Sequence, residues 1–190
     1  MGSRLASLLL LLLSPALGLA QQQVFTANPA QSEVHITLGG SAHTTHGMFR
    51  VERGAVDFNG HATTLSGMVV VSAASGDTGN SGRDSRMKSE VLEAPKFSDI
   101  SFAPKSYEGQ LSASGDSTIQ VNGIFTLHGT PHDLTIPMQV HMDGKQSTVK
   151  AHFLVPYVEW GLKNPSKFIL KVDKQVAVDV MLVGAVTPAS

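Results

Sequence analysis

The feature that most constrains this chain is an alternation of apolar and polar residues with a period of two. It is clearest over residues 133–142, where Leu, Ile, Met, Val and Met alternate with polar residues or Pro. Successive side chains of a β-strand point to opposite faces, so this pattern predicts a strand with one apolar face and one face in water. The same period dominates residues 24–184, which favours a mostly β fold over a helical one.

The alternation and several shorter apolar runs divide this region into separate strands. The expected strands cover residues 34–38, 49–58, 65–73, 98–107, 118–127, 133–142, 149–155 and 176–182. Turn-forming residues lie between them, as at Gly129–Pro131 and Asp143–Gln146. The spacing is that of an antiparallel meander of about eight or nine strands.

Two places depart from this pattern. Pro137 has no amide hydrogen to donate to a sheet, so its strand is an edge, carries a bulge or is bent there. The segment Ser75–Phe97 begins as a Gly/Ser-rich loop, and its second half, Asp84–Glu93, can form a short helix. Ser81 and Asp84 have the spacing of a capping box at its start. We therefore expect a crossing loop with one short helix.

Residues 1–20 are typical of a secretory signal peptide. They contain one charged residue, Arg4, an unbroken run from Leu8 to Leu13, and small residues at Gly18 and Ala20. A membrane span needs about 20 apolar residues, so a retained anchor is the weaker alternative and no stable membrane anchor is expected. Cleavage after Ala20 would leave one domain, residues 21–190, in a periplasmic or secreted protein.

Composition excludes several classes of function. The chain has no Cys, which removes disulfides, zinc–thiolate sites and thiol catalysis. Its 14 Lys and Arg nearly balance 15 Asp and Glu without a basic run, so nucleic acid is not an expected partner. The common nucleotide-binding, metalloprotease and hydrolase motifs are absent from the sequence. We expect no cofactor and no enzymatic activity.

The spacing of histidines supports an alternative hypothesis. His46 stands in a loop that enters a strand, while His128 and His132 bracket the turn HGTPH. Neutral imidazoles ligate divalent metals, so these three residues with Arg83 or Asp84 would make an exported metal-binding or hydrolytic protein. The competing interpretation is that they are turn and strand-end residues, since no complete ligand set is visible. A third interpretation is an interaction module with a solid core.

Five segments, in order along the chain, carry a family resemblance. They are SEVHITL at 32–38, HGMF at 46–49, GRDSRMKSEVLEAPKFSDISF at 82–102, GIFTLHGTPHDLTIPMQV at 123–140 and EWGLKNPS at 159–166. Together they resemble the YceI-like family of exported polyisoprenoid- or lipid-binding proteins. The sequence departs from the family pattern at Val91–Glu93, where many members have paired aromatics, and at Glu159–Gly161, where they have Arg-x-x-Phe-Gly.

The resemblance implies an all-β fold, an antiparallel lipocalin-like β-barrel of about eight strands with one short helix, over residues 21–190. It also implies an amphiphilic isoprenoid or fatty-acid-like lipid held in an apolar barrel cavity, for sequestration, transport or stress protection. The apolar residues expected to contact this lipid are Ile36, Phe49, Phe102, Phe125, Ile136, Met138, Phe153 and Phe168. The motif residues expected near the site are Arg83, Asp84, His46, His128 and Trp160. Assembly into a homodimer is left open.

Overall fold

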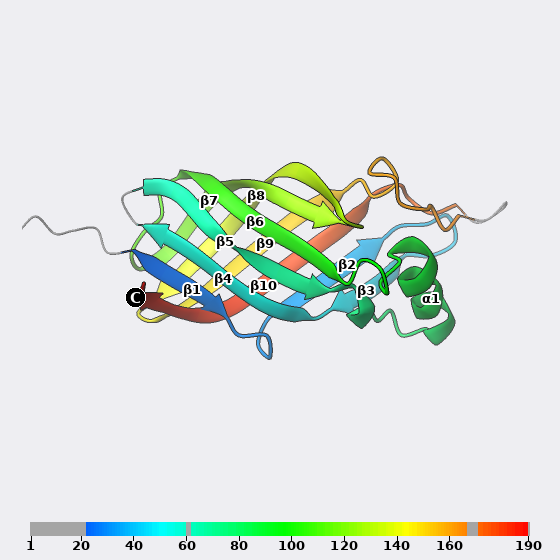
Figure 1. Cartoon of the computed structure of the whole chain (residues 1–190), viewed down its shortest axis with the longest axis horizontal. Helices are drawn as coiled ribbons and strands as arrows, with labels where there is room; N and C mark the ends of the chain where they lie inside the picture. Colours follow the sequence, from blue (N-terminus) through cyan, green and yellow to red (C-terminus); the bar gives the residue numbers. More distant parts are fainter. Residues whose placement is uncertain (1–21, 60–61, 167–170, 190) are drawn as a thin grey trace, which may run out of the picture.

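A computed structural model describes residues 22–59, 62–166 and 171–189, and in it antiparallel strands form one continuous sheet. The strands are β1 (Gln23–Ala27), β2 (Glu33–Leu38), β3 (Thr45–Phe49), β4 (Val51–Asn59), β5 (Ala62–Ser72), β6 (Asp99–Gly109), β7 (Gly115–Leu127), β8 (Thr130–Asp143), β9 (Gln146–Val155) and β10 (Val176–Pro188). The order across the sheet is β1-β4-β5-β6-β7-β8-β9-β10-β2-β3. An additional pairing of β1 with β10 closes the sheet into a barrel (Figure 1).

Two of the barrel strands are interrupted, so ten segments make an eight-stranded barrel. β1 and β2 both pair with β10, along residues 184–188 and 177–181 respectively. β3 pairs with β2, and β4 pairs with β1, so Arg50 separates two halves of one long strand. The prediction of an antiparallel β-barrel of about eight strands is confirmed.

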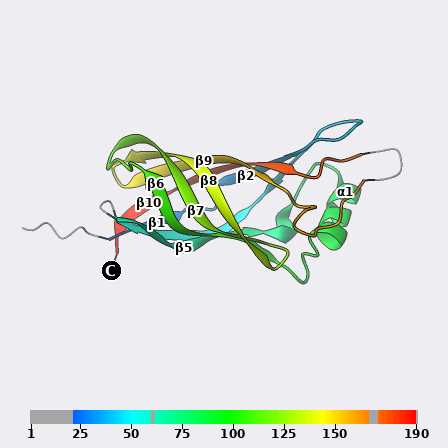
Figure 2. The same cartoon turned by 90° about the horizontal axis from the view of Figure 1, so that it is seen from above.

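The short helical segment lies between β5 and β6, at one end of the barrel (Figures 1 and 2). It comprises a 3-10 turn η1 (Ala73–Ser75), the helix α1 (Ser81–Arg86) and one π-helical turn η2 (Met87–Val91). We call this end of the barrel the α1 end. The expected helix over Asp84–Glu93 therefore begins and ends too late, since the observed helix starts at Ser81.

The side chain of Asn80 explains the earlier start of the helix. Its Oδ1 accepts a hydrogen bond from the Arg83 amide at 3.0 Å, which satisfies a helix N–H that would otherwise have no partner. The capping box of Ser81 and Asp84 does not form, because the Asp84 carboxylate accepts hydrogen bonds from the amide and hydroxyl of Thr78.

The alternation of the sequence becomes the inner and outer faces of the barrel. In β7, every second residue from Ser117 to Leu127 is buried, and the residues between them are more exposed. The inward side chains of neighbouring strands form one apolar cluster, which includes Phe25, Tyr107 and Phe125. The strand periodicity thus predicts which residues face the interior.

Pro137 lies where β8 separates from β9. β7 pairs with β8 from Thr130 to Met142, whereas β9 pairs with β8 only from Met138 to Asp143. Residues 130–137 of β8 therefore form an edge on the β9 side, where a missing amide hydrogen costs no ladder bond. Of the three alternatives for Pro137, the structure shows the edge.

Two predicted features fall outside the described residues: the signal peptide, residues 1–20, and Phe168. Within the described ranges, no helix is both long enough and apolar enough to cross a membrane.

Closure of the barrel between β1 and β10 requires that Gly184 has no side chain. A Cβ here would lie 2.2 Å from the Thr26 carbonyl oxygen and 2.7 Å from Cε2 of Phe25. We expect Gly184→Ala to lower the free energy of unfolding by about 1 to 3 kcal/mol, because the methyl group overpacks this contact. Urea unfolding followed by circular dichroism measures the change.

The control for this prediction is Gly82→Ala, which adds the same methyl group on α1. The nearest atom to a Cβ there is Asn80 Oδ1, at 3.5 Å, so the substitution meets no obstacle. We expect it to be neutral or to stabilise the protein by up to about 1 kcal/mol, because Ala favours a helix more than Gly does. Equal destabilisation by both substitutions would show that closure does not depend on Gly184.

Candidate functional site

A mostly apolar cavity of about 830 Å³ lies inside the barrel. All ten strands contribute side chains to its wall, together with α1, η2 and the loop after β9. Ligand pockets of about 300 to 1,000 Å³ are typical of sites for small molecules, so this cavity has the size of a binding site. Its presence counts against the interpretation as an interaction module with a solid core.

The residues predicted to contact a lipid lie largely on this wall. Seven of the eight line the cavity, namely Ile36, Phe49, Phe102, Phe125, Ile136, Met138 and Phe153. The eighth, Phe168, is not among the described residues. That the seven contact a ligand stays a prediction.

Sequence reasoning missed other residues of the wall, especially the valines of three strands. Val69 of β5, Val149 of β9 and Val180 of β10 line the cavity beside the predicted aromatics. The signal that identifies them is strand parity, because each lies an even number of residues from another inward side chain of its own strand. A prediction that selects only bulky residues therefore misses part of the cavity lining.

Arg83 and Asp84 meet at Thr78, at the α1 end. Arg83 donates from Nε to the Thr78 hydroxyl at 2.7 Å and from Nη2 to the Thr78 carbonyl at 2.8 Å. The Asp84 carboxylate accepts from the Thr78 amide at 3.0 Å and from the same hydroxyl. Only Arg83 of this pair lines the cavity. Asp84 is buried and holds the loop that precedes the helix.

The three histidines of the metal hypothesis each have a different neighbour. Nδ1 of His46 lies 3.2 Å from the Thr37 hydroxyl, and Nε2 of His128 lies 3.0 Å from Oε2 of Glu93. His132 stacks on the ring of Trp160. In the part of the chain that the structure describes, no three His, Asp or Glu side chains are placed so that they could hold a metal ion. The structure does not bring together the cluster that this hypothesis requires.

Trp160 covers the opening between β8 and β9. Its ring stacks on His132, with centroids 3.9 Å apart and planes at 7°, and lies 5.8 Å from the ring of Phe125. Phe125 in turn contacts Phe153 edge to face across 6.0 Å, and both of these rings line the cavity. The loop after β9 thus closes the side of the barrel where the strands separate.

Tyr157 anchors this loop. Its side chain is buried, and its hydroxyl donates a hydrogen bond to the Asp173 carbonyl oxygen at 2.7 Å. Burial of the phenol, followed by the nearby Asp173 carboxylate, raises the pKa of Tyr157 above its usual value. The raised pKa reflects an apolar environment at the base of the loop.

Comparison with known proteins gives one family. The model of the YceI-like domain matches residues 25–183. Three solved structures share the fold at 17% identity: Burkholderia cenocepacia BcnA (TM-score 0.67, covering 83% of this chain and 99% of that chain), a polyisoprenoid binding domain from Saccharophagus degradans (0.67, 85% and 98%) and a Campylobacter jejuni YCEI protein (0.56, 70% and 79%). A search of curated proteins finds no match.

The pKa of Tyr157 predicts how the anchor responds to alkaline pH. The folded-state pKa is raised above the unfolded value, near pH 10, so the stability that the neutral phenol contributes is fully present below pH 10. It is lost as the pH rises from there through the folded-state pKa. We expect Tyr157→Phe to cost about 1 kcal/mol at neutral pH, through loss of the hydrogen bond to Asp173.

Urea unfolding of both proteins across neutral and alkaline pH measures this difference in stability. We expect the difference to narrow above pH 10, because only the wild-type phenol can ionise. A difference that stays constant over the whole range would contradict the role assigned to Tyr157.

Proposed function

Because this chain belongs to the YceI-like family, we propose that it binds an amphiphilic lipid, with an isoprenoid or fatty-acid-like tail, inside its barrel. The observation that carries the proposal is the apolar cavity to which every strand contributes. The solved structure from S. degradans, which shares this fold, is described as a polyisoprenoid binding domain, and this supports the ligand class.

The hydrophobic effect would supply the driving force for binding. Burying an apolar tail is favourable by about 0.8 kcal/mol per CH₂ group, so ten such groups would contribute about 8 kcal/mol before the cost of ordering the chain. Met138 and Met142 on the wall have flexible side chains that can adapt to tails of different shape. Binding of this kind needs no catalytic residue, and we propose no enzymatic activity.

We also propose that the mature protein is periplasmic or secreted and serves in sequestration, transport or stress protection of its lipid. The support for export is the sequence of residues 1–20. Amino-terminal sequencing of exported protein should give Gln21 as the first residue. A first residue before position 15 would contradict the proposed cleavage.

Native mass spectrometry of gently purified protein tests lipid binding directly. We expect a population with an added mass equal to one lipid per chain, because one elongated tail fills one cavity. The same spectrum reports whether the chain is a monomer or a homodimer. A spectrum without added mass, from protein that also takes up no added isoprenoid or fatty acid, would refute the proposal.

A substitution in the cavity sharpens this test. Met138 of β8 lines the cavity, whereas the next residue, Gln139, is exposed on the outer face. We expect Met138→Trp to lower lipid occupancy about tenfold or more, because the indole fills space that the tail requires. It should keep the barrel fold, since overpacking costs about 1 to 3 kcal/mol.

The matched control is Gln139→Trp, which adds the same indole outside the barrel. It should co-purify lipid at the wild-type stoichiometry. If Met138→Trp stays folded by circular dichroism and retains the lipid as fully as the control does, the lipid does not occupy this cavity.

A further inference from the structure

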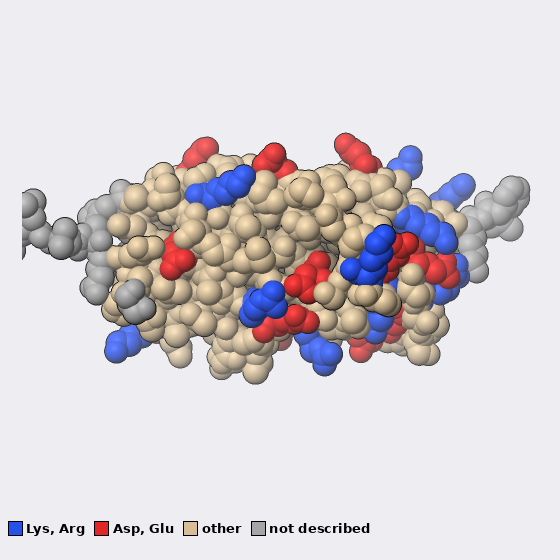
Figure 3. Space-filling view, in the orientation of Figure 1, with Lys and Arg blue, Asp and Glu red and all other residues tan. Residues whose placement is uncertain are grey.

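The charged side chains on the cavity wall all lie at the α1 end, and positive charge predominates. Among the described lining residues, Arg83, Arg86 and Lys163 are cationic at neutral pH, and only Glu90 is anionic. The rest of the wall is mostly apolar. On the face shown in Figure 3, Lys, Arg, Asp and Glu side chains gather around α1, whereas fewer lie over the barrel wall. The cavity therefore has one polar end and an apolar remainder.

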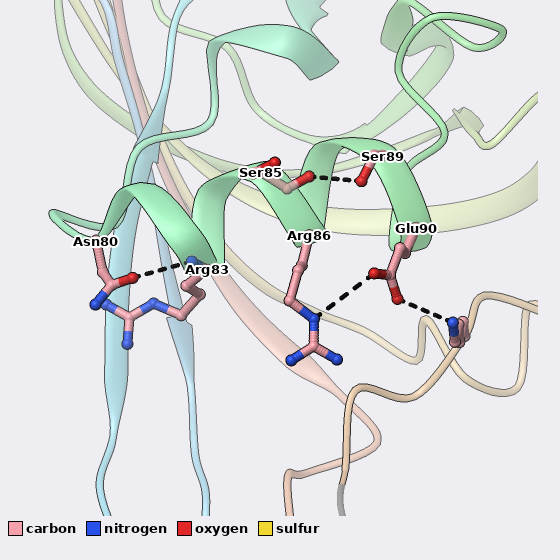
Figure 4. A network of polar contacts seen from close by, with 7 residues as sticks. Asn80, Arg83, Ser85, Arg86, Ser89 and Glu90 are labelled. Atoms are coloured by element: carbon pink, nitrogen blue, oxygen red, sulfur yellow. Dashed lines mark hydrogen bonds and ion pairs between the residues drawn. The ribbon is translucent and has the colours of Figure 1, made fainter.

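The helix places three of these residues on one face. Arg83, Arg86 and Glu90 lie at positions i, i+3 and i+7, and Figure 4 shows their side chains projecting from the same side of the helix. Nε of Arg86 lies 3.7 Å from Oε1 of Glu90, and Nζ of Lys163 lies 3.0 Å from its Oε2. Among the described residues, this carboxylate thus contacts two cations, one on the helix and one on the loop after β9.

Arg83 is anchored without an ion pair. Its guanidinium donates to the hydroxyl and carbonyl of Thr78, both neutral groups, and no carboxylate of the described residues lies within 4.0 Å of it. The Asp84 carboxylate is bound to the same Thr78 and does not line the cavity. Arg83 therefore presents a positive charge in a fixed position at the α1 end.

We propose that the α1 end selects a lipid with an anionic head group, a carboxylate or a phosphate, held by Arg83 with help from Arg86 and Lys163. Guanidinium groups bind both kinds of oxyanion through paired, charge-assisted hydrogen bonds. The inference rests on the proposed function, because the tail in the barrel brings the head group to these residues. Glu90 competes with the head group for Arg86 and Lys163.

Three probes with the same tail test the head-group preference: geranylgeraniol, geranylgeranoic acid and geranylgeranyl phosphate. Each competes with the neutral fluorescent reporter N-phenyl-1-naphthylamine for the purified protein. We expect the acid, the phosphate or both to bind about tenfold more tightly than the alcohol at low salt. Comparing the acid with the phosphate shows which of the two head groups is preferred. High salt should reduce the difference in affinity between the anions and the alcohol, because it screens the charges.

Substitutions show which residues cause the preference. For each variant, the measured quantity is the ratio of the affinity for the anion to the affinity for the alcohol. Arg83→Gln should lower this ratio about tenfold, and Arg86→Gln should lower it less, because Arg86 is already paired. Glu90→Gln should raise the ratio, because it frees two cations for the head group. Lys88→Gln removes a cation from the same helix that does not line the cavity, and it should leave the ratio unchanged.

The outcomes separate this inference from the function on which it rests. If the alcohol binds as tightly as both anions, the lipid is bound but its head group is not selected. If the anions bind more tightly but Arg86→Gln and Glu90→Gln leave the ratio at its wild-type value, the charged residues of the α1 end do not cause the preference, and the inference is overturned. If neither the reporter nor any probe binds, both the proposed function and the inference are overturned. If Arg83→Gln releases Thr78 and unfolds the loop, Arg86→Gln still tests the inference, because Arg86 is exposed and its substitution does not disturb Thr78.

Discussion

Backbone pairing between the two ends of the described chain is the interaction on which the cavity depends. Gln23 of β1 pairs with Pro188 of β10, and this ladder joins the first strand to the last. Without it the sheet would have free edges, which attract other strands or fold over to bury the apolar face. With it, the inward side chains surround the cavity, and the wall is continuous between β1 and β10 because Gly184, which has no side chain, lets β1 approach β10 closely.

An apolar interior that is not filled lacks contacts that a solid core would have. Side chains such as Val180 and Phe153 line the cavity, so the atoms that face it lack the dispersion contacts of a filled core. A lipid that binds the folded barrel and not the unfolded chain restores those contacts and stabilises the fold by mass action. Stability and ligand binding are therefore coupled in this architecture.

The alternation of the sequence was sufficient to predict the barrel strands that have apolar inward residues, including β8 with Ile136 and Met138. It missed β3, because the inward positions of this strand include Thr45 and Gly47, which are not large apolar residues. It also missed β1, a short strand that pairs with β10 at the far end of the chain. Contacts between segments far apart in the chain could not be predicted from the sequence either.

The candidate site shows the same division between local and distant information. Parity along each strand predicted Phe125 and Phe153 on the wall, since each strand carries that information by itself. The ion pair between Glu90 and Lys163 requires knowing that the loop after β9 meets the helix, and the sequence does not supply this. The histidines were misleading for the same reason, because the fold gives each a different neighbour: Thr37 for His46, Glu93 for His128 and the Trp160 ring for His132.

Because β8 separates from β9, the barrel wall is not held together in the same way all around. Around most of its circumference, neighbouring strands are joined by backbone hydrogen bonds, which fix the distance between them. Beside residues 130–137 the contact is the stacking of Trp160 on His132, while the backbone amides of Tyr157, Val158, Trp160, Gly161 and Leu162 bond to Val155, Lys174 or their own loop. Because no backbone ladder joins β8 to β9 beside residues 130–137, a change in the distance between them there would not require breaking any of the described strand pairs.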